Sequence, residues 1–298
     1  MPGNMLLGSI QISGEHLSTV EVRDICDSLK NNSTRLLSLR GCKIDDEDFG
    51  PLATAIGESK SIVQLNLNLG VVSDSSRARL LGEALTRNRS LNSLFLHGSP
   101  LGDEGLTVLI PSLSTHPFLT SLDLGDCRLG DGSIKLISAL LPPDGARQGI
   151  HDLTLSANPA ITARGWAQLS VALASSSTIR TLCVDYNSIG DYGAGMLAVV
   201  VAGSRTLEVL DMEGTGLTEF GGQVFLDLVQ NYPVTLKQLV LCENGVSEET
   251  QQQVNSCLSV NTEDTAQEEA ASPDPGPSTS VTPGRSHDRD TAAAAVEA

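Results

Sequence analysis

Aromatic residues are scarce in this chain of 298 residues, of which they make up 3%. The sequence holds one Trp and five Phe. Because 40% of the residues are nevertheless hydrophobic, the chain can bury a sizeable core, but that core must be aliphatic. Regularly repeated leucines form such an aliphatic core, whereas the cores of most enzymes are not of this kind. The composition therefore favours a repeat architecture.

Positive charge is also in short supply. Nineteen Lys and Arg residues stand against 36 Asp and Glu, which gives a formal net charge of −17. A surface of this sign repels the phosphates of nucleic acids and the headgroups of anionic membranes. The sequence therefore predicts no nucleic-acid partner and no membrane partner, and it favours a protein partner with a basic surface.

Long hydrophobic runs are missing as well. The longest apolar run lies around residues 196–202, far below the roughly 20 residues that span a bilayer, and the first ten residues lack the basic start of a signal peptide. Six cysteines are scattered without clustering, as is typical of reduced thiols. We therefore expect a cytoplasmic protein. The cysteines are Cys26, Cys42, Cys127, Cys183, Cys242 and Cys257.

Standard catalytic motifs are absent from the sequence. It contains no phosphate-binding G-x-x-x-x-G-K-[ST] loop, no H-E-x-x-H, no paired C-x-x-C and no G-x-S-x-G elbow. It also lacks a loop of alternating oxygen ligands of the kind that binds calcium. We therefore expect a protein that is not an enzyme and that carries no cofactor and no metal.

One pattern, LxxLxLxx(N/C/x)xL, recurs nine times along the chain. We call its middle apolar residue the marker. The spacings between successive markers are 27, 28, 29, 28, 31, 29, 28 and 29 residues, and the longest interval contains the Pro- and Gly-bearing insertion 141–145. The markers are Ile10, Leu37, Leu65, Leu94, Leu122, Leu153, Leu182, Leu210 and Leu239.

Each period combines two hydrophobic rhythms. The residues around the marker alternate with a period of two, as a strand does, whereas the second half, such as 105–113, places apolar residues three and four apart, as a helix does. Such units bury their leucines only by stacking. The sequence predicts an α/β solenoid, a horseshoe of about nine repeats over residues 1–260, with a parallel sheet on the concave face and helices on the convex face.

The final residues, 261–298, lack the repeat. From residue 262 onward they hold eight acidic and two basic residues and Pro-rich runs such as 272–277, so we expect a disordered acidic tail. Removing this net charge of −6 leaves −11 on the repeat body. The acidity is therefore expected to belong mainly to the folded surface.

The repeat length, the N/C position and helical segments such as 101–106 resemble ribonuclease-inhibitor-type leucine-rich repeats, which NOD-like receptors and Ran GTPase-activating proteins share. The resemblance covers about residues 5–260. It implies a horseshoe that binds proteins. It also leaves two alternatives open: a GTPase-activating protein of the Ran-regulator type, for which Arg40 is the candidate catalytic residue, and an accessory partner of a NOD-like sensor.

Residues between the core leucines point into the concave face, which can therefore be described from the sequence. Carboxylates gather on its second half, and two aromatic residues lie near them. An acidic field with aromatic anchors suits a Lys- or Arg-rich partner, although Asp at such positions can also serve solubility alone. The predicted binding residues are Phe95, His97, Asp123, Asp126, Asp152, Asp185, Tyr186, Asp211, Glu213 and Glu243.

Overall fold

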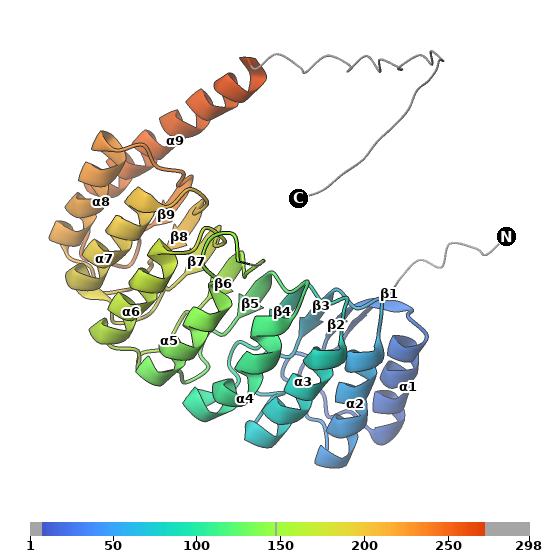
Figure 1. Cartoon of the computed structure of the whole chain (residues 1–298). Coiled ribbons are helices and arrows are strands. Elements are labelled where there is room, and N and C mark those ends of the chain that lie inside the picture. Colours follow the sequence, from blue (N-terminus) through green and yellow to red (C-terminus); the bar gives the residue numbers. More distant parts are fainter. Residues whose placement is uncertain (1–7, 147, 272–298) are drawn as a thin grey trace, which may run out of the picture.

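The computed structural model describes residues 8–146 and 148–271, with side chains up to residue 259. Figure 1 shows a curved solenoid with the strands on the inner side of the arc and the helices on the outer side. Within these residues the strands form one nine-stranded sheet in sequence order. The predicted horseshoe of nine repeats is therefore confirmed.

The strands are β1 (Gly8–Gln11), β2 (Thr34–Ser38), β3 (Gln64–Asn66), β4 (Ser93–Phe95), β5 (Ser121–Asp123), β6 (Asp152–Thr154), β7 (Thr181–Cys183), β8 (Val209–Asp211) and β9 (Gln238–Val240). The α-helices are α1 (Thr19–Lys30), α2 (Asp46–Glu58), α3 (Ser75–Arg87), α4 (Gly102–Thr115), α5 (Asp131–Ile137), α6 (Ala163–Ala174), α7 (Gly190–Gly203), α8 (Glu219–Asn231) and α9 (Glu248–Ala271). A short 3₁₀ helix, η1 (Ser138–Leu140), follows α5.

The sheet is parallel, and its register follows the markers. Each marker pairs with the marker of the next strand, from Ile10 with Leu37 to Leu210 with Leu239. The markers from Leu37 onward are buried, at about 1.5–3 kcal/mol for each such side chain. Because a shift of one residue would turn every leucine outward, the hydrophobic pattern sets the register.

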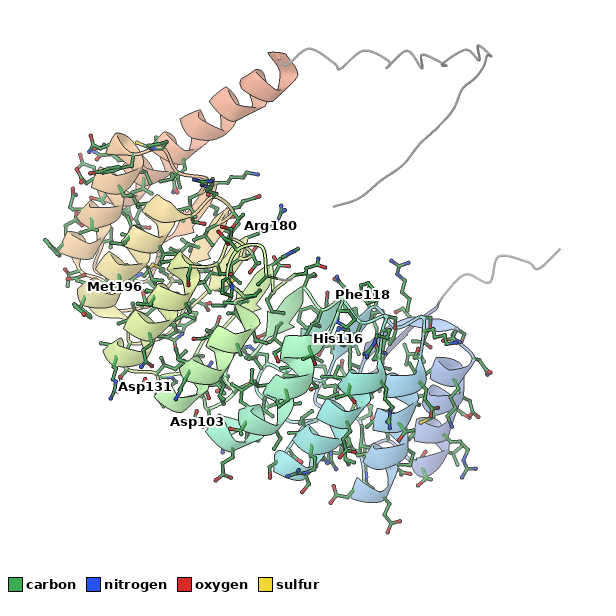
Figure 2. All side chains as sticks on the ribbon, in the orientation of Figure 1. Asp103, His116, Phe118, Asp131, Arg180 and Met196 are labelled. Atoms are coloured by element: carbon green, nitrogen blue, oxygen red, sulfur yellow. The ribbon has the colours of Figure 1, made fainter. Side chains whose placement is uncertain are left out.

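A set of acidic residues links neighbouring repeats along the N-terminal ends of the helices. Asp131 accepts hydrogen bonds from the backbone N and Oγ1 of Thr162 in the next repeat, at 2.8 and 2.7 Å, and Asp191 does the same with Thr218 at 2.9 and 2.6 Å. A carboxylate is also favourable at the positive end of a helix dipole. We call Asp103, Asp131, Asp191 and Glu219 the carboxylate ladder. Figure 2 labels two of its members, Asp103 and Asp131.

The other two members make equivalent contacts. Asp103 accepts from the backbone N of Gly130 at 3.0 Å and of Ser133 at 3.1 Å, and Glu219 accepts from the backbone N of Ser247 at 2.7 Å. Hydrogen bonds from Thr162 and Thr218 hold the pKa of Asp131 and Asp191 below the usual value. Hydrogen bonds from the side chains of Thr250 and Gln223 and from the backbone N of Ser247 lower the pKa of Glu219 to about 2. Part of the net negative charge therefore stabilises the fold by linking one repeat to the next.

The side chain at the ninth position of the repeat, the N/C position of the pattern, forms hydrogen bonds with the loop that follows the strand. The buried amide of Asn158 donates to the carbonyls of Leu124, Leu155 and Ser156 at 3.0, 3.0 and 3.1 Å, and its oxygen accepts from the backbone N of Cys127 at 3.1 Å. Cys127 is buried at the same position one repeat earlier and donates to backbone carbonyls through its thiol. The short polar or sulfur side chain at this position thus satisfies buried backbone groups.

The last helix does not end at residue 260, the expected end of the repeat domain. Helix α9 runs from Glu248 to Ala271 and so continues past residue 260, and Figure 1 shows its end projecting from the repeat body. The expected disorder of residues 272–298 lies outside the described residues. Among the described residues, no helix combines the length and apolar character that crossing a bilayer requires. The same part of the chain holds no group of three or more His, Cys, Asp or Glu placed to share a metal ion.

Candidate protein-binding face

A turn with left-handed backbone follows every strand, and it sets the geometry of the concave face. The fourth residue after each marker has φ between 47° and 73°. Four of the nine residues there are glycine, which adopts this conformation freely, and five carry side chains at an energetic cost. The nine residues are Gly14, Gly41, Leu69, Gly98, Asp126, Ala157, Tyr186, Gly214 and Glu243.

Three predicted binding residues, Asp126, Tyr186 and Glu243, occupy this left-handed position. All three are exposed. A left-handed residue points its side chain in a direction that an extended strand cannot. The turn therefore displays these three side chains at the rim where the strands end, and the sequence pattern alone did not separate them from the other candidates.

The remaining candidates fall into rows because the sheet is in register. Phe95, Asp123 and Asp211 lie in the row directly after the markers, with Thr154 and Cys183 standing between the two acids. Asp152 lies in the row before the markers, in β6. The third residues after the markers form another row. That row contains His97, Asp185 and Glu213.

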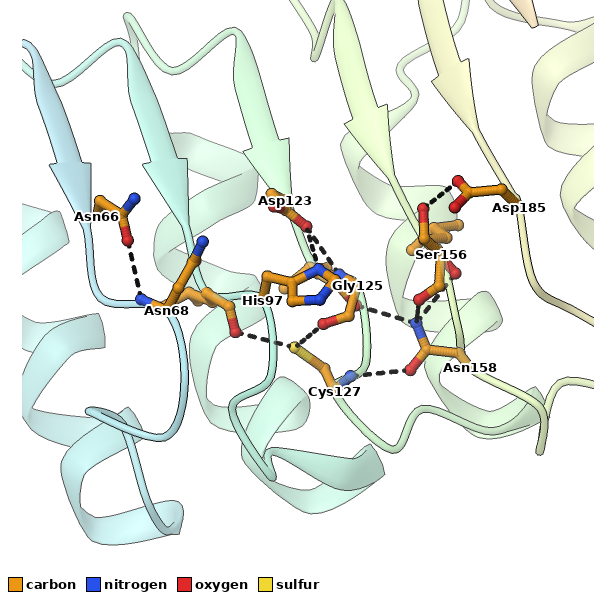
Figure 3. A network of polar contacts seen from close by, with 12 residues as sticks. Asn66, Asn68, His97, Asp123, Gly125, Cys127, Ser156, Asn158 and Asp185 are labelled. Carbon is orange, nitrogen blue, oxygen red and sulfur yellow. Dashed lines mark hydrogen bonds and ion pairs between the residues drawn. The ribbon is translucent and has the colours of Figure 1, made fainter. Parts of the chain in front are cut away.

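His97 and Asp123 face each other across adjacent repeats, as Figure 3 shows. Nδ1 of His97 lies 3.6 Å from Oδ1 of Asp123, which also accepts a hydrogen bond from the backbone N of Gly125 at 2.9 Å. A Cβ on Gly125 would collide with Nδ1, so glycine makes room for the imidazole. Burial raises the pKa of Asp123, since its carboxylate is only partly accessible to water.

Asp123 and Asp211 both shape turns. Asp211 accepts from the backbone N of Glu213 at 3.0 Å, and Asn66 holds the backbone N of Asn68 at 3.0 Å in the same way. The pKa of Asp211 is also raised, mainly by burial. Because an asparagine performs the same task in an earlier repeat, these two carboxylates have a structural role beside any role in binding.

Tyr186 places an exposed aromatic ring on this face. Its side chain is 48% exposed, and its hydroxyl donates to Glu213 and lies 3.4 Å from Oε2 of Glu243. The hydrogen bond to Glu213 raises the pKa of Tyr186. The ring rests against Gly214, where a Cβ would come within 2.9 Å of a ring carbon.

The other acidic residues differ in whether their carboxylates form hydrogen bonds. Asp185 accepts a hydrogen bond from Ser156, visible in Figure 3. Asp126 and Asp152 make no side-chain hydrogen bond or ion pair with any described residue. They are therefore the carboxylates most available to a partner.

Sequence reasoning missed the supporting residues. Gly125, Gly214 and Ser156 give room or hydrogen bonds to His97, Tyr186 and Asp185. A detectable signal was present for the two glycines, because each stands one repeat after the larger residue that it accommodates. Cys183, in the row directly after the markers, is half-buried, and burial followed by the charge of Asp211 raises its pKa to about 11.

Known proteins share this repeat pattern. Residues 115–138 match the family model described as "Leucine Rich repeat". Leucine-rich repeat-containing protein 73 from Rattus norvegicus is 60% identical over 255 residues, which cover 86% of this chain and 81% of that protein. The chain belongs to the leucine-rich-repeat family of that protein. The human protein of the same name is 59% identical over the same coverage.

Leucine-rich repeats of the ribonuclease-inhibitor type are more distant relatives. Ribonuclease inhibitor from Sus scrofa is 26% identical over 80% of this chain, and the chain spans about half, 52%, of that protein. Among solved structures, the Rad7 and Elc1 complex in yeast has a TM-score of 0.57 at 17% identity, covering 80% of this chain and 57% of that one. This likeness shows the fold alone.

Proposed function

We propose that this leucine-rich-repeat protein is a non-enzymatic scaffold that binds a protein with a basic surface through the second half of its concave face. The observation that carries the proposal is the exposed ring of Tyr186 next to Glu243, on the same concave face as Asp126 and Asp152, whose side chains make no hydrogen bond with a described residue. Aromatic side chains supply much of the binding energy at protein interfaces, and surrounding charges steer the partner.

The rigidity of the sheet supports the same function. Neighbouring strands lie about 4.8 Å apart, so carboxylates on successive strands add their fields over the same region. The turns fix the backbone of Asp126, Tyr186 and Glu243 before a partner arrives, which lowers the entropy cost of binding. An attraction of this kind weakens as salt increases, because about 0.15 M salt screens exposed charges beyond roughly 8 Å.

Similar proteins support a binding role over a catalytic one. The name of ribonuclease inhibitor states a protein target. Arg40, the candidate for GTPase activation, is exposed after β2, and its side chain makes no hydrogen bond or ion pair with a described residue. No observation favours that activity over scaffolding.

The proposal is tested with two variants that change the net charge equally. The concave variant carries Asp126→Lys, Asp152→Lys and Glu243→Lys, none of which removes a turn-forming bond. The convex control carries Glu47→Lys, Glu83→Lys and Glu104→Lys, at exposed helix positions without side-chain partners in the described chain. Both are used as baits, beside the unchanged protein, in affinity capture from nuclease-treated cell lysate.

A basic protein captured by the unchanged chain and the convex control, and lost with the concave variant, would support the proposal. Circular dichroism of all three baits shows whether folding is equal. Capture of the same proteins by all three baits would contradict the proposal that the concave face is the binding surface. Capture that is seen only in a parallel lysate without nuclease would contradict a direct protein partner.

A further inference from the structure

Helix α7 lacks the polar outer face that a surface helix normally has. Between Tyr192 and Gly203 it contains no charged residue. Its outward stripe is formed by Tyr192, Met196, Val199 and Gly203, which follow one another at spacings of four, three and four residues, and Tyr192 and Val199 are 68% and 67% exposed. Figure 2 labels Met196 on the outer side of the solenoid.

The neighbouring helices extend this apolar surface. Phe220 of α8 is 69% exposed and holds the same repeat position as Tyr192, while Val171 of α6 is also exposed. We call Val171, Tyr192, Met196, Val199, Ala202 and Phe220 the α7 patch. Single exposed apolar residues are ordinary, but a contiguous group on three adjacent helices is typical of an interface.

The corresponding face of α3 shows what a solvated helix of this protein looks like. Its exposed positions include Arg79, Glu83 and Arg87. A helix that is apolar on all sides is normally covered on all sides. The contrast between α3 and α7 therefore indicates that something covers α7.

The order of residues along α7 suits a second α7 running in the opposite direction. In the central antiparallel register, Met196 stands opposite Val199 of the other copy, and Tyr192 stands opposite Gly203. A Cβ on Gly203 would have no atom within 4 Å, so that end of the helix has room for the Tyr192 ring. The antiparallel arrangement also places opposite helix-dipole ends together.

The charges flanking the stripe agree with the same arrangement. Asp191 lies at the N-terminal end of α7, and Arg205 lies just after its C-terminal end. Arg205 is exposed and makes no hydrogen bond or ion pair with a described residue. In an antiparallel pair each Arg205 approaches the Asp191 end of the other copy, so both ends of the contact join opposite charges.

We propose that a second copy of this chain covers the α7 patch, so that two solenoids pair back to back through antiparallel α7 helices. A helix of 14 residues is about 21 Å long and roughly 10 Å wide, so three helices offer on the order of 600 Å² per copy. This lies below the roughly 800 Å² per partner of a standard interface. The dimer is therefore weak, and both concave faces stay open.

The first test measures self-association of the full chain by sedimentation velocity from micromolar to several hundred micromolar protein. The unchanged chain should shift from monomer to dimer within this range, and Tyr192→Lys should raise the dissociation constant at least tenfold. Val20→Lys is the matched control, because Val20 holds the same repeat position in the first repeat and is 62% exposed. It should dimerise like the unchanged chain.

A cross-linking test checks the register. A chain carrying both Tyr192→Cys and Gly203→Cys should form a disulfide-linked dimer on mild oxidation, whereas either substitution alone should not increase linkage above the unchanged chain. The two positions are 11 residues apart on one helix, about 16 Å, so they cannot bond within one copy. A monomer at every concentration, a dimer insensitive to Tyr192→Lys, or no added cross-link in the double variant would each overturn the proposal.

Discussion

Tyr186 lies with its ring against the backbone of Gly214 in the next repeat, where a Cβ would approach a ring carbon to 2.9 Å. The glycine is thus a platform for the most exposed aromatic side chain of the concave face. It also has φ of 59°, so its backbone suits glycine for a second reason.

Gly214→Ala should therefore displace Tyr186 and weaken capture of the basic partner severalfold. Gly216→Ala is the matched control, since Gly216 has φ of 76° but a Cβ there would meet no atom within 4 Å. Both substitutions should lower the free energy of unfolding by about 1 kcal/mol because of the left-handed backbone. Equal loss of partner binding in both variants would refute the platform role of Gly214.

Asp123 can be tested for its turn-forming role with two substitutions. Asp123→Asn should leave the free energy of unfolding nearly unchanged, because an amide oxygen can accept from the backbone N of Gly125 as Asn66 does from Asn68. Asp123→Ala should cost about 1 kcal/mol through loss of that bond. Chemical denaturation of the two variants measures the difference, and an equal loss in both would show that the charge matters more than the turn.

The carboxylate ladder should make stability fall in acid. The pKa values of Asp131 and Asp191 are lowered in the folded chain, and that of Glu219 is lowered to about 2. A lowered folded pKa contributes stability above the unfolded value near 4, and this contribution is lost as the pH falls from about 4 toward 2.

Asp131→Asn, Asp191→Asn and Glu219→Gln together should therefore lower Tm at neutral pH and flatten the fall of Tm between about pH 5 and pH 2.5. Thermal unfolding across this range measures both effects. Glu104→Gln, an exposed change in the first turn of α4, is the control and should leave the profile unchanged. A triple variant with the native pH profile would exclude the ladder as the cause.

Ala157 should gain stability when replaced by glycine. Its φ of 53° is unfavourable for a residue with a Cβ, and most of that cost disappears in Ala157→Gly. After the added entropy of the unfolded chain, we expect a net gain of about 0.5–1 kcal/mol in chemical denaturation. A loss of stability would mean that the methyl group contributes more by packing than the turn costs.

Cys183 and Cys242 should differ in reactivity. Cys242 is exposed, whereas Cys183 is half-buried and its pKa is raised to about 11, so it holds almost no thiolate at neutral pH. Brief alkylation with iodoacetamide near neutral pH, followed by peptide mass spectrometry, should label Cys242 well before Cys183. The order should reverse only if the neighbourhood of Cys183 opens.

The sequence predicted the repeats because the leucines that mark them are also the residues that pair across the sheet. Leu122 and Leu153 are separated by an insertion, yet they pair in register like the others. This part of the fold depends on local patterns that repeat, so it can be predicted without long-range information.

The candidate face could be predicted only in outline. The sequence located Asp123 and Asp126 on the concave side, but it could not show that Asp123 closes a turn while Asp126 stands on left-handed backbone without a side-chain partner among the described residues. Both features depend on the dihedral angles after β5 and on Gly125. Neither feature produces a periodic pattern of hydrophobic residues, so the periodicity of the sequence did not reveal them.

The hydrogen bonds that the carboxylate ladder makes between repeats each join one repeat to the next and no further. Each repeat is thus coupled only to its two neighbours, so the repeats unfold together only while every contact between neighbours is intact. Helix α5, with seven residues, is the shortest α-helix of the described chain, and it precedes the insertion. Heat should therefore divide the solenoid there first, into two blocks that melt separately.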